Sequence, residues 1–148
     1  MNDRMIRTIL LVEDSQADAE MAMDALREAN LVNPVVHLED GVDCLDYLYA
    51  RGAWADRERL DPAVVLLDIK MPRMNGLDVL TQMRSDERMR RIPVVILSSS
   101  REESDLARSW DLGVNAYVVK PVDADQFFQA VKTLGTFWAV FNEVPSED

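Results

Sequence analysis

Acidic side chains follow two of the apolar runs in this chain, at the point where each run ends. Glu13 and Asp14 come directly after the run at 8–12, and Asp68 follows the run at 63–67. Apolar runs without polar alternation are typical of parallel strands covered by helices on both faces. Because ligands gather beyond the carboxyl ends of such strands, these acids are placed for chemistry. Carboxylates at one edge repel one another unless a cation lies among them, and oxygen ligands of this kind suit Mg²⁺.

A hydroxyl and an ammonium group follow two further apolar runs. Ser98 comes after the run at 94–97, and Lys120 after the run at 116–119. An acid cluster beside a lysine and a hydroxyl suits a phosphoryl group, since cations neutralise its oxygens while one carboxylate attacks phosphorus. Asp68 is the favoured nucleophile because its strand should stand between the acid pair and the other two groups. The alternative interpretation is that each acid only caps the helix after it.

The rest of the chain alternates strand and helix. We expect five strands, at 8–12, 35–38, 63–67, 94–97 and 116–119. Five helices are expected to begin near Ser15, Gly41, Gly76, Glu102 and Asp123. This alternation predicts right-handed crossovers and a doubly wound parallel sheet of the α/β class.

Apolar spacing also predicts what individual residues do. The core positions expected in the first helix are Met21, Ala22, Ala25, Leu26 and Ala29. The lone cysteine, Cys44, is expected to be a small apolar filler, and the lone histidine, His37, a structural residue of its strand. The polar stretch at 51–62 is expected to be an exposed loop.

Composition excludes several classes of protein. With 16 basic and 27 acidic residues among 148, the formal charge is −11, which disfavours direct binding to nucleic acid or to an anionic membrane surface. One cysteine allows neither an intramolecular disulfide nor a cysteine metal cluster, and it fits a reducing compartment. Residues 1–7 lack the apolar stretch of a signal peptide, and no segment approaches the roughly 20 apolar residues needed to span a bilayer. We therefore expect a cytoplasmic protein.

These residues resemble the receiver domain of two-component response regulators. The resemblance runs from about 8 to 134 and rests on Glu13, Asp14, Asp68, Met71, Pro72, Asn75, Gly76, Ser98, Tyr117, Val118, Val119, Lys120 and Pro121. It implies a flavodoxin-like fold with strand order 2-1-3-4-5. It also implies a cis peptide bond between Lys120 and Pro121. The length of the chain suits a single domain over 1–148, with a last helix that extends to about 142, and we expect no output domain because residues 143–148 are too few and too polar to form one.

The resemblance assigns the acceptor and the metal ligands. Asp68 would be the phosphoryl acceptor, and Asp14 a direct ligand of Mg²⁺. Glu13 would contact the metal through water, and Lys70 would offer its backbone carbonyl.

The resemblance also assigns the groups around the phosphoryl oxygens. Ser98 and Lys120 would each bind one oxygen, and Tyr117 would turn inward as the hydroxyl moves toward phosphate. Lys70 and Ser100 occupy positions that flank the attacking water and tune hydrolysis.

Three features depart from the common receiver pattern. Serine stands at 98 where threonine is commoner, glutamate stands at 13 where aspartate is also frequent, and the loop at 51–62 is longer than in minimal receivers. That loop and the extension of the last helix are similar to the stand-alone regulators that partner bacterial and cyanobacterial phytochromes.

The resemblance leaves functions of different classes to weigh. The first is a response regulator that takes a phosphoryl group from a sensor histidine kinase, such as a bacteriophytochrome, and signals through protein contacts or passes the group onward as a phosphotransfer intermediate or phosphate sink. The second is an enzyme, a Mg²⁺-dependent phosphatase that works through an aspartyl-phosphate. Haloacid-dehalogenase-type hydrolases place an aspartate two residues after the nucleophile, and Lys70 stands there in this chain. A degenerate scaffold of the same fold is the third. We therefore expect a phosphoryl acceptor rather than an enzyme.

Aromatic residues near the carboxyl terminus predict self-association. Phe127, Val131 and Leu134 suffice to dock the last helix, so the aromatic residues beyond them need another cover: Phe137, Trp138 and Phe141. A symmetric homodimer through this helix would cover them. The alternatives are that these rings fold back on their own domain, for instance against Trp54, or that Gly135 ends the helix.

Overall fold

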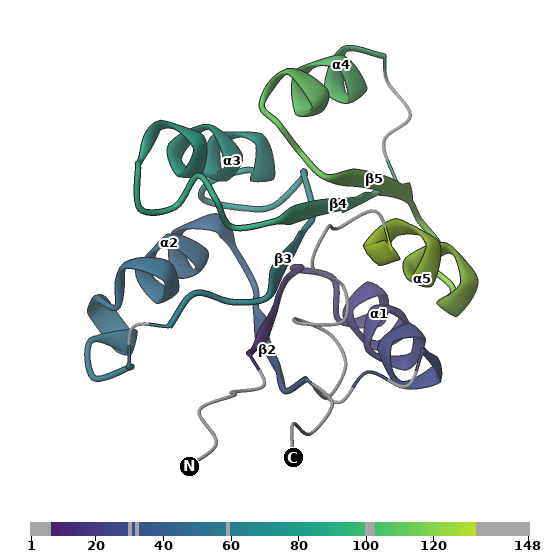
Figure 1. Cartoon of the computed structure of the whole chain (residues 1–148), viewed down its shortest axis with the longest axis horizontal. Coiled ribbons are helices and arrows are strands. Elements are labelled where there is room, and N and C mark those ends of the chain that lie inside the picture. The colour runs from purple at the N-terminus through teal and green to yellow at the C-terminus, as the bar shows by residue number, and fades with distance from the viewer. Residues whose placement is uncertain (1–6, 30, 32, 59, 100–102, 133–148) are drawn as a thin grey trace, which may run out of the picture.

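Five parallel strands form one sheet in the computed structural model, which describes residues 7–29, 31, 33–58, 60–99 and 103–132. The strands are β1 (Ile9–Val12), β2 (Val35–Leu38), β3 (Val64–Leu67), β4 (Val94–Ser98) and β5 (Ala116–Val119). Their order is β2-β1-β3-β4-β5, as predicted (Figure 1). All four neighbouring pairs are parallel, so every strand ends at the same edge of the sheet.

Helices cover both faces of the sheet. They are α1 (Gln16–Glu28), α2 (Gly41–Tyr49), the 3-10 helix η1 (Gly52–Trp54), α3 (Gly76–Ser85), α4 (Glu103–Asp111) and α5 (Ala124–Lys132). Figure 1 shows α1 and α5 side by side on one face, with α2 and α3 on the other. Within the described residues, no helix has the length and apolar character needed to cross a bilayer.

The core is divided between the two faces by the pleat of the strands. In β1, Ile9 and Leu11 pack toward α1 and α5, whereas Leu10 and Val12 pack toward α2 and α3. All four of these side chains are at most 1% exposed, which explains the unbroken apolar run. Cys44 is fully buried among the apolar side chains between the sheet and the helices α2 and α3, as expected of a small apolar filler.

One prediction for α1 was wrong. Met21 is 43% exposed, and Ala19 is buried in its place beside Ala22, Ala25 and Leu26. The helix is rotated so that Met21 lies at the flank of the buried stripe. Met23, on the opposite flank, packs against the core instead.

The loop at 51–62 is largely exposed, as predicted, but it carries η1. Trp54 of η1 packs edge-to-face on Tyr47 of α2, with ring centroids 5.0 Å apart. The expected extension of the last helix, with Leu134, Gly135, Phe137, Trp138 and Phe141, lies outside the described residues.

Candidate functional site

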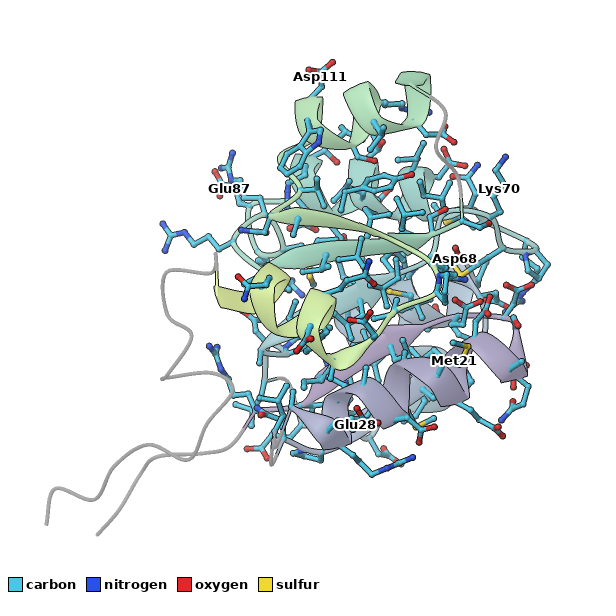
Figure 2. All side chains as sticks on the ribbon, turned by 90° about the vertical axis from the view of Figure 1, so that its right-hand side faces the viewer. Met21, Glu28, Asp68, Lys70, Glu87 and Asp111 are labelled. Atoms are coloured by element: carbon cyan, nitrogen blue, oxygen red, sulfur yellow. The ribbon has the colours of Figure 1, made fainter. Side chains whose placement is uncertain are left out.

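Neighbouring strands bring the predicted acids together at one edge of the sheet. Val12 pairs with Leu67, so Glu13 and Asp68 leave adjacent strands at the same level. The Asp68 N–H donates to the Val12 carbonyl at 3.0 Å. Figure 2 shows Asp68 and Lys70 at this edge, with Glu87 at the opposite end of the strands.

Glu13, Asp14 and Asp68 form a compact group of oxygen donors. One carboxylate oxygen from each lies within 4.8 Å of the other two. Glu13 and Asp68 are buried, whereas Asp14 is exposed. Burial and then the charge of Glu13 raise the pKa of Asp68 to about 6, although Lys120 acts in the opposite direction.

This donor set fits a small divalent cation. Mg²⁺ takes one or two carboxylates and keeps several waters, and the exposed side of Asp14 leaves room for them.

Lys120 directly follows β5, the edge strand of the sheet, and its side chain reaches the acids. Its Nζ lies 2.5 Å from Glu13 Oε1, 2.9 Å from Asp18 Oδ2 and 3.5 Å from Asp68 Oδ1. Burial acts against the ammonium charge, but hydrogen bonds to Glu13 and Asp18 outweigh it and raise the pKa of Lys120. The peptide bond between Lys120 and Pro121 is cis, as the resemblance implies.

Asp18 is a member of the site that was not predicted from the sequence. It lies in the first turn of α1, where its N–H donates to the Ser15 hydroxyl at 3.2 Å. Asp14 lies before the helix cap, so helical spacing does not relate the two acids, and the contact of Asp18 with Lys120 comes from the packing of α1 on the sheet.

The capping alternative does not hold for Glu13, Asp14 and Asp68. The side chain that caps α1 belongs to Ser15, and the side chain that caps α3 belongs to Asn75, whose Oδ1 accepts from the Asp78 N–H at 3.0 Å.

Ser98 and Tyr117 lie on the two strands beyond Asp68. Ser98 is the last residue of β4 and is 1% exposed. The Lys120 N–H donates to the Ser98 carbonyl at 2.9 Å, which sets the two residues side by side. Tyr117 is half-buried and lines a groove of about 940 Å³ together with Trp110 of α4 and Gln126 of α5.

Lys70 is exposed in the loop between β3 and α3. With Asp14, it lines a groove of about 560 Å³ that reaches Asp105 and Arg108 of α4. Ser100, its predicted counterpart in tuning hydrolysis, lies outside the described residues.

His37 takes the structural role expected of it. Its ring nitrogen Nε2 lies 2.7 Å from the backbone carbonyl oxygen of Glu13, to which it donates. The contact ties β2 to the end of β1 directly before Asp14.

Comparisons with known proteins agree with this geometry. A family model described as the response regulator receiver domain matches residues 9–132. The response regulator Rcp1 of Synechocystis sp. is 33% identical over 89% of this chain and 88% of its own. A structure of Rcp1 with bound Mn²⁺ has a TM-score of 0.75 at 31% identity and covers 95% of this chain and 99% of its own.

Two further solved structures are similar to this chain. The bacteriophytochrome response regulator RtBRR has a TM-score of 0.86 at 53% identity and covers 95% of this chain and 85% of its own. The phosphorylated cyanobacterial phytochrome response regulator RcpA has a TM-score of 0.75 at 39% identity, with coverage of 90% and 94%.

Proposed function

This chain belongs to the response regulator receiver family, and we propose that it accepts a phosphoryl group on Asp68 from a sensor histidine kinase with the help of Mg²⁺. The observation that carries this proposal is the surroundings of the Asp68 carboxylate. It has Lys120 Nζ at 3.5 Å and oxygens of Glu13 and Asp14 within 4.8 Å. Positive charge from the lysine and from a bound metal ion would then flank the reacting oxygen.

In the proposed transfer an Asp68 oxygen attacks the phosphorus of the kinase's phosphohistidine. The P–N bond breaks as the new O–P bond forms, and the imidazole leaves after it is protonated. Because the pKa of Asp68 is about 6, the attacking carboxylate is mostly ionised above pH 7. Glu13, Asp14, Asp68 and the backbone carbonyl of Lys70 would hold Mg²⁺, which when bound neutralises the phosphoryl oxygens.

Lys120 is the group whose contacts must change. It is bound to Glu13 and Asp18, so a phosphoryl group on Asp68 would compete with these acids for its ammonium. Buried Ser98 would bind a second phosphoryl oxygen. We propose that Tyr117 then turns inward and changes the surface that a protein target contacts.

Lys70 and Ser100 are proposed to flank the water that hydrolyses the aspartyl-phosphate. The exposed side chain of Lys70 beside Asp14 supports its part in this proposal. The same residue argues against a phosphatase, because it stands where haloacid-dehalogenase-type hydrolases place their second aspartate.

The relatives support a phytochrome-type kinase as the partner. Two of the similar structures are phytochrome response regulators by name, one bacterial and one cyanobacterial. We therefore propose a role in light signalling in the cytoplasm, where a histidine kinase would present its phosphohistidine. A role as phosphate sink differs from this only in lacking a protein target.

The decisive experiment compares Asp68→Asn with the wild type. Both are incubated with Mg²⁺ and a small acyl-phosphate donor, then with a phosphorylated phytochrome kinase, and acid-labile phosphate is measured. We expect labelling of the wild type and of the exposed-loop variant Asp61→Asn, and none of Asp68→Asn. Undiminished labelling of Asp68→Asn would exclude the assignment, and release of phosphate from an aryl phosphate would favour the phosphatase.

We also propose a homodimer that uses Phe137, Trp138 and Phe141. One observation supports it: Trp54, the suggested intramolecular partner of these rings, already packs on Tyr47. Sedimentation of the wild type and of Phe137→Ala/Trp138→Ala tests it, with a shift from dimer to monomer expected in the variant. A monomeric wild type at high micromolar concentration contradicts the proposal.

A further inference from the structure

The loop between β3 and α3 contains a backbone conformation that is unusual for its residue. Arg73 has a φ of 66°, in the left-handed region that favours glycine. Among the described residues, Ala50 is the other non-glycine residue with a positive φ, and it ends α2 as a helix cap. Arg73 ends no helix, so another interaction must hold it in this conformation.

The side chain of Arg73 provides that interaction. Its Nε donates to Asp40 Oδ2 at 2.8 Å, and its Nη2 donates to Asp40 Oδ1 at 3.0 Å and to Asp43 Oδ1 at 3.2 Å. The two bonds to Asp40 match the planar fork of a guanidinium to one carboxylate. The Asp40 side chain is 13% exposed and also caps α2 by accepting from the Asp43 N–H. Arg73 therefore binds a carboxylate whose position is already set by the helix.

Close backbone contacts hold the same loop at its tip and at its base. At the tip, a Cβ added to Gly41 would lie 2.3 Å from the Met74 carbonyl oxygen, so the loop touches the first turn of α2. At the base, the Gly76 N–H donates to the Ile69 carbonyl at 2.7 Å. The segment between these points carries Lys70.

We propose that Arg73 is a positioning residue of the metal site. Its ion pairs with Asp40 and Asp43 fix the β3–α3 loop against α2, and this fixes the backbone carbonyl of Lys70 toward a cation held by the acid cluster. The inference rests on the proposed function, because it needs Lys70 to be a ligand. The physical reason is that a carbonyl on a loop binds a metal tightly only if the loop is already held in the binding geometry.

The test measures Mn²⁺ binding to the full, unphosphorylated chain, with Mg²⁺ as competitor. Loss of groups that orient metal ligands typically weakens affinity about 10–100-fold. We expect about a 10-fold loss in Arg73→Ala, at the low end because only one ligand is affected. Arg73→Gly should lose as much Mn²⁺ affinity, because glycine accepts the positive φ but removes the ion pairs with Asp40 and Asp43. Arg73→Lys should bind Mn²⁺ more tightly than Arg73→Ala but less tightly than the wild type, because an ammonium cannot form the two parallel hydrogen bonds to Asp40.

A matched control lies at the other end of the same helix. Arg51 pairs with Asp46 at 2.9 Å and is 57% exposed, against 53% for Arg73. Arg51→Ala also removes a half-exposed arginine that pairs with an acid of α2, and it should leave Mn²⁺ affinity unchanged. Asp40→Asn keeps a capping residue on α2 but weakens the ion pair with Arg73. Its effect on Mn²⁺ affinity should be largely absent when Arg73 has already been replaced by alanine.

A second readout needs no metal. Hydrogen exchange of peptides covering 69–76 in the metal-free protein should be faster in Arg73→Ala than in the wild type or in Arg51→Ala. If wild-type and Arg73→Ala proteins bind Mn²⁺ equally, or if Arg51→Ala weakens binding as much, the inference is wrong while the metal site stands. If the wild type binds no divalent cation, the proposed function fails and the inference fails with it.

Discussion

Replacing Asp68 with asparagine is expected to stabilise the metal-free protein against unfolding. Burial and the neighbouring Glu13 raise the pKa of Asp68 from 3.8 to about 6 in the folded chain. The folded state therefore binds this proton more tightly than the unfolded state does. As the pH rises from about 4 to about 6, ionisation of Asp68 costs stability, and the full cost is present above that range.

The size of this cost depends on the shift in pKa. At about 1.4 kcal/mol per unit, the shift from 3.8 to about 6 corresponds to at most about 3 kcal/mol. Water that reaches the cluster beside exposed Asp14 reduces this, so we expect about 1–2 kcal/mol at pH 7.5. At about pH 5 only part of the range has been crossed, and the advantage of Asp68→Asn should be roughly half as large.

Urea unfolding with a chelator at both pH values measures the difference. Asp61→Asn, which changes an exposed acid, is the control and should match the wild type. Saturating Mg²⁺ should abolish or reverse the advantage of Asp68→Asn, because the metal binds the wild-type carboxylate. Equal stability of Asp68→Asn and wild type at pH 7.5, or a difference that does not change with pH, would refute the reasoning.

Three further predictions concern the neighbours of Asp68. Asp14→Ala should weaken Mg²⁺ binding at least 10-fold in a titration, because a carboxylate ligand is lost; unchanged binding would argue against the site. Lys120→Ala should still accept phosphate while Tyr117 no longer responds, and an unaltered Tyr117 signal by NMR would contradict this. Asp18→Asn should make the Tyr117 response to phosphorylation larger, because fewer acids compete for Lys120. Glu20→Gln, on the exposed face of the same helix, should leave the response at the wild-type level.

The residues at the strand ends could be predicted because their position at the carboxyl edge of the sheet follows directly from the sequence. A buried parallel strand is visible as an apolar run, and the residues directly after the run must emerge at the carboxyl edge of the sheet. Glu13, Asp68, Ser98 and Lys120 were found in this way, and their pairing needed only the strand order.

Asp18 and Arg73 could not be found in this way. Asp18 meets Lys120 only because of the rotation of α1 on the sheet, and the same rotation exposes Met21. Periodicity gives the width of an apolar stripe and leaves its phase open when, as in α1, the stripe is mostly alanine. Arg73 meets Asp40 across 33 positions of sequence through a turn whose φ is unfavourable for arginine. Local preference predicts against that turn.

The charge balance of the site explains why these two additions matter. Three carboxylates, those of Glu13, Asp18 and Asp68, surround the ammonium of Lys120, and an oxygen of Asp14 lies within 4.8 Å of oxygens of Glu13 and Asp68. One lysine cannot neutralise them, so a phosphoryl group would add charge to a site that is already too negative. A metal ion at Glu13 and Asp14 would offset part of that excess and weaken the hold of Glu13 on Lys120. Only then can the lysine turn to the phosphoryl oxygens at a cost of one remaining bond, to Asp18. On this reasoning metal binding must precede the response, and the precision with which the metal is held, through Arg73 and the Lys70 carbonyl, sets how readily Lys120 is released.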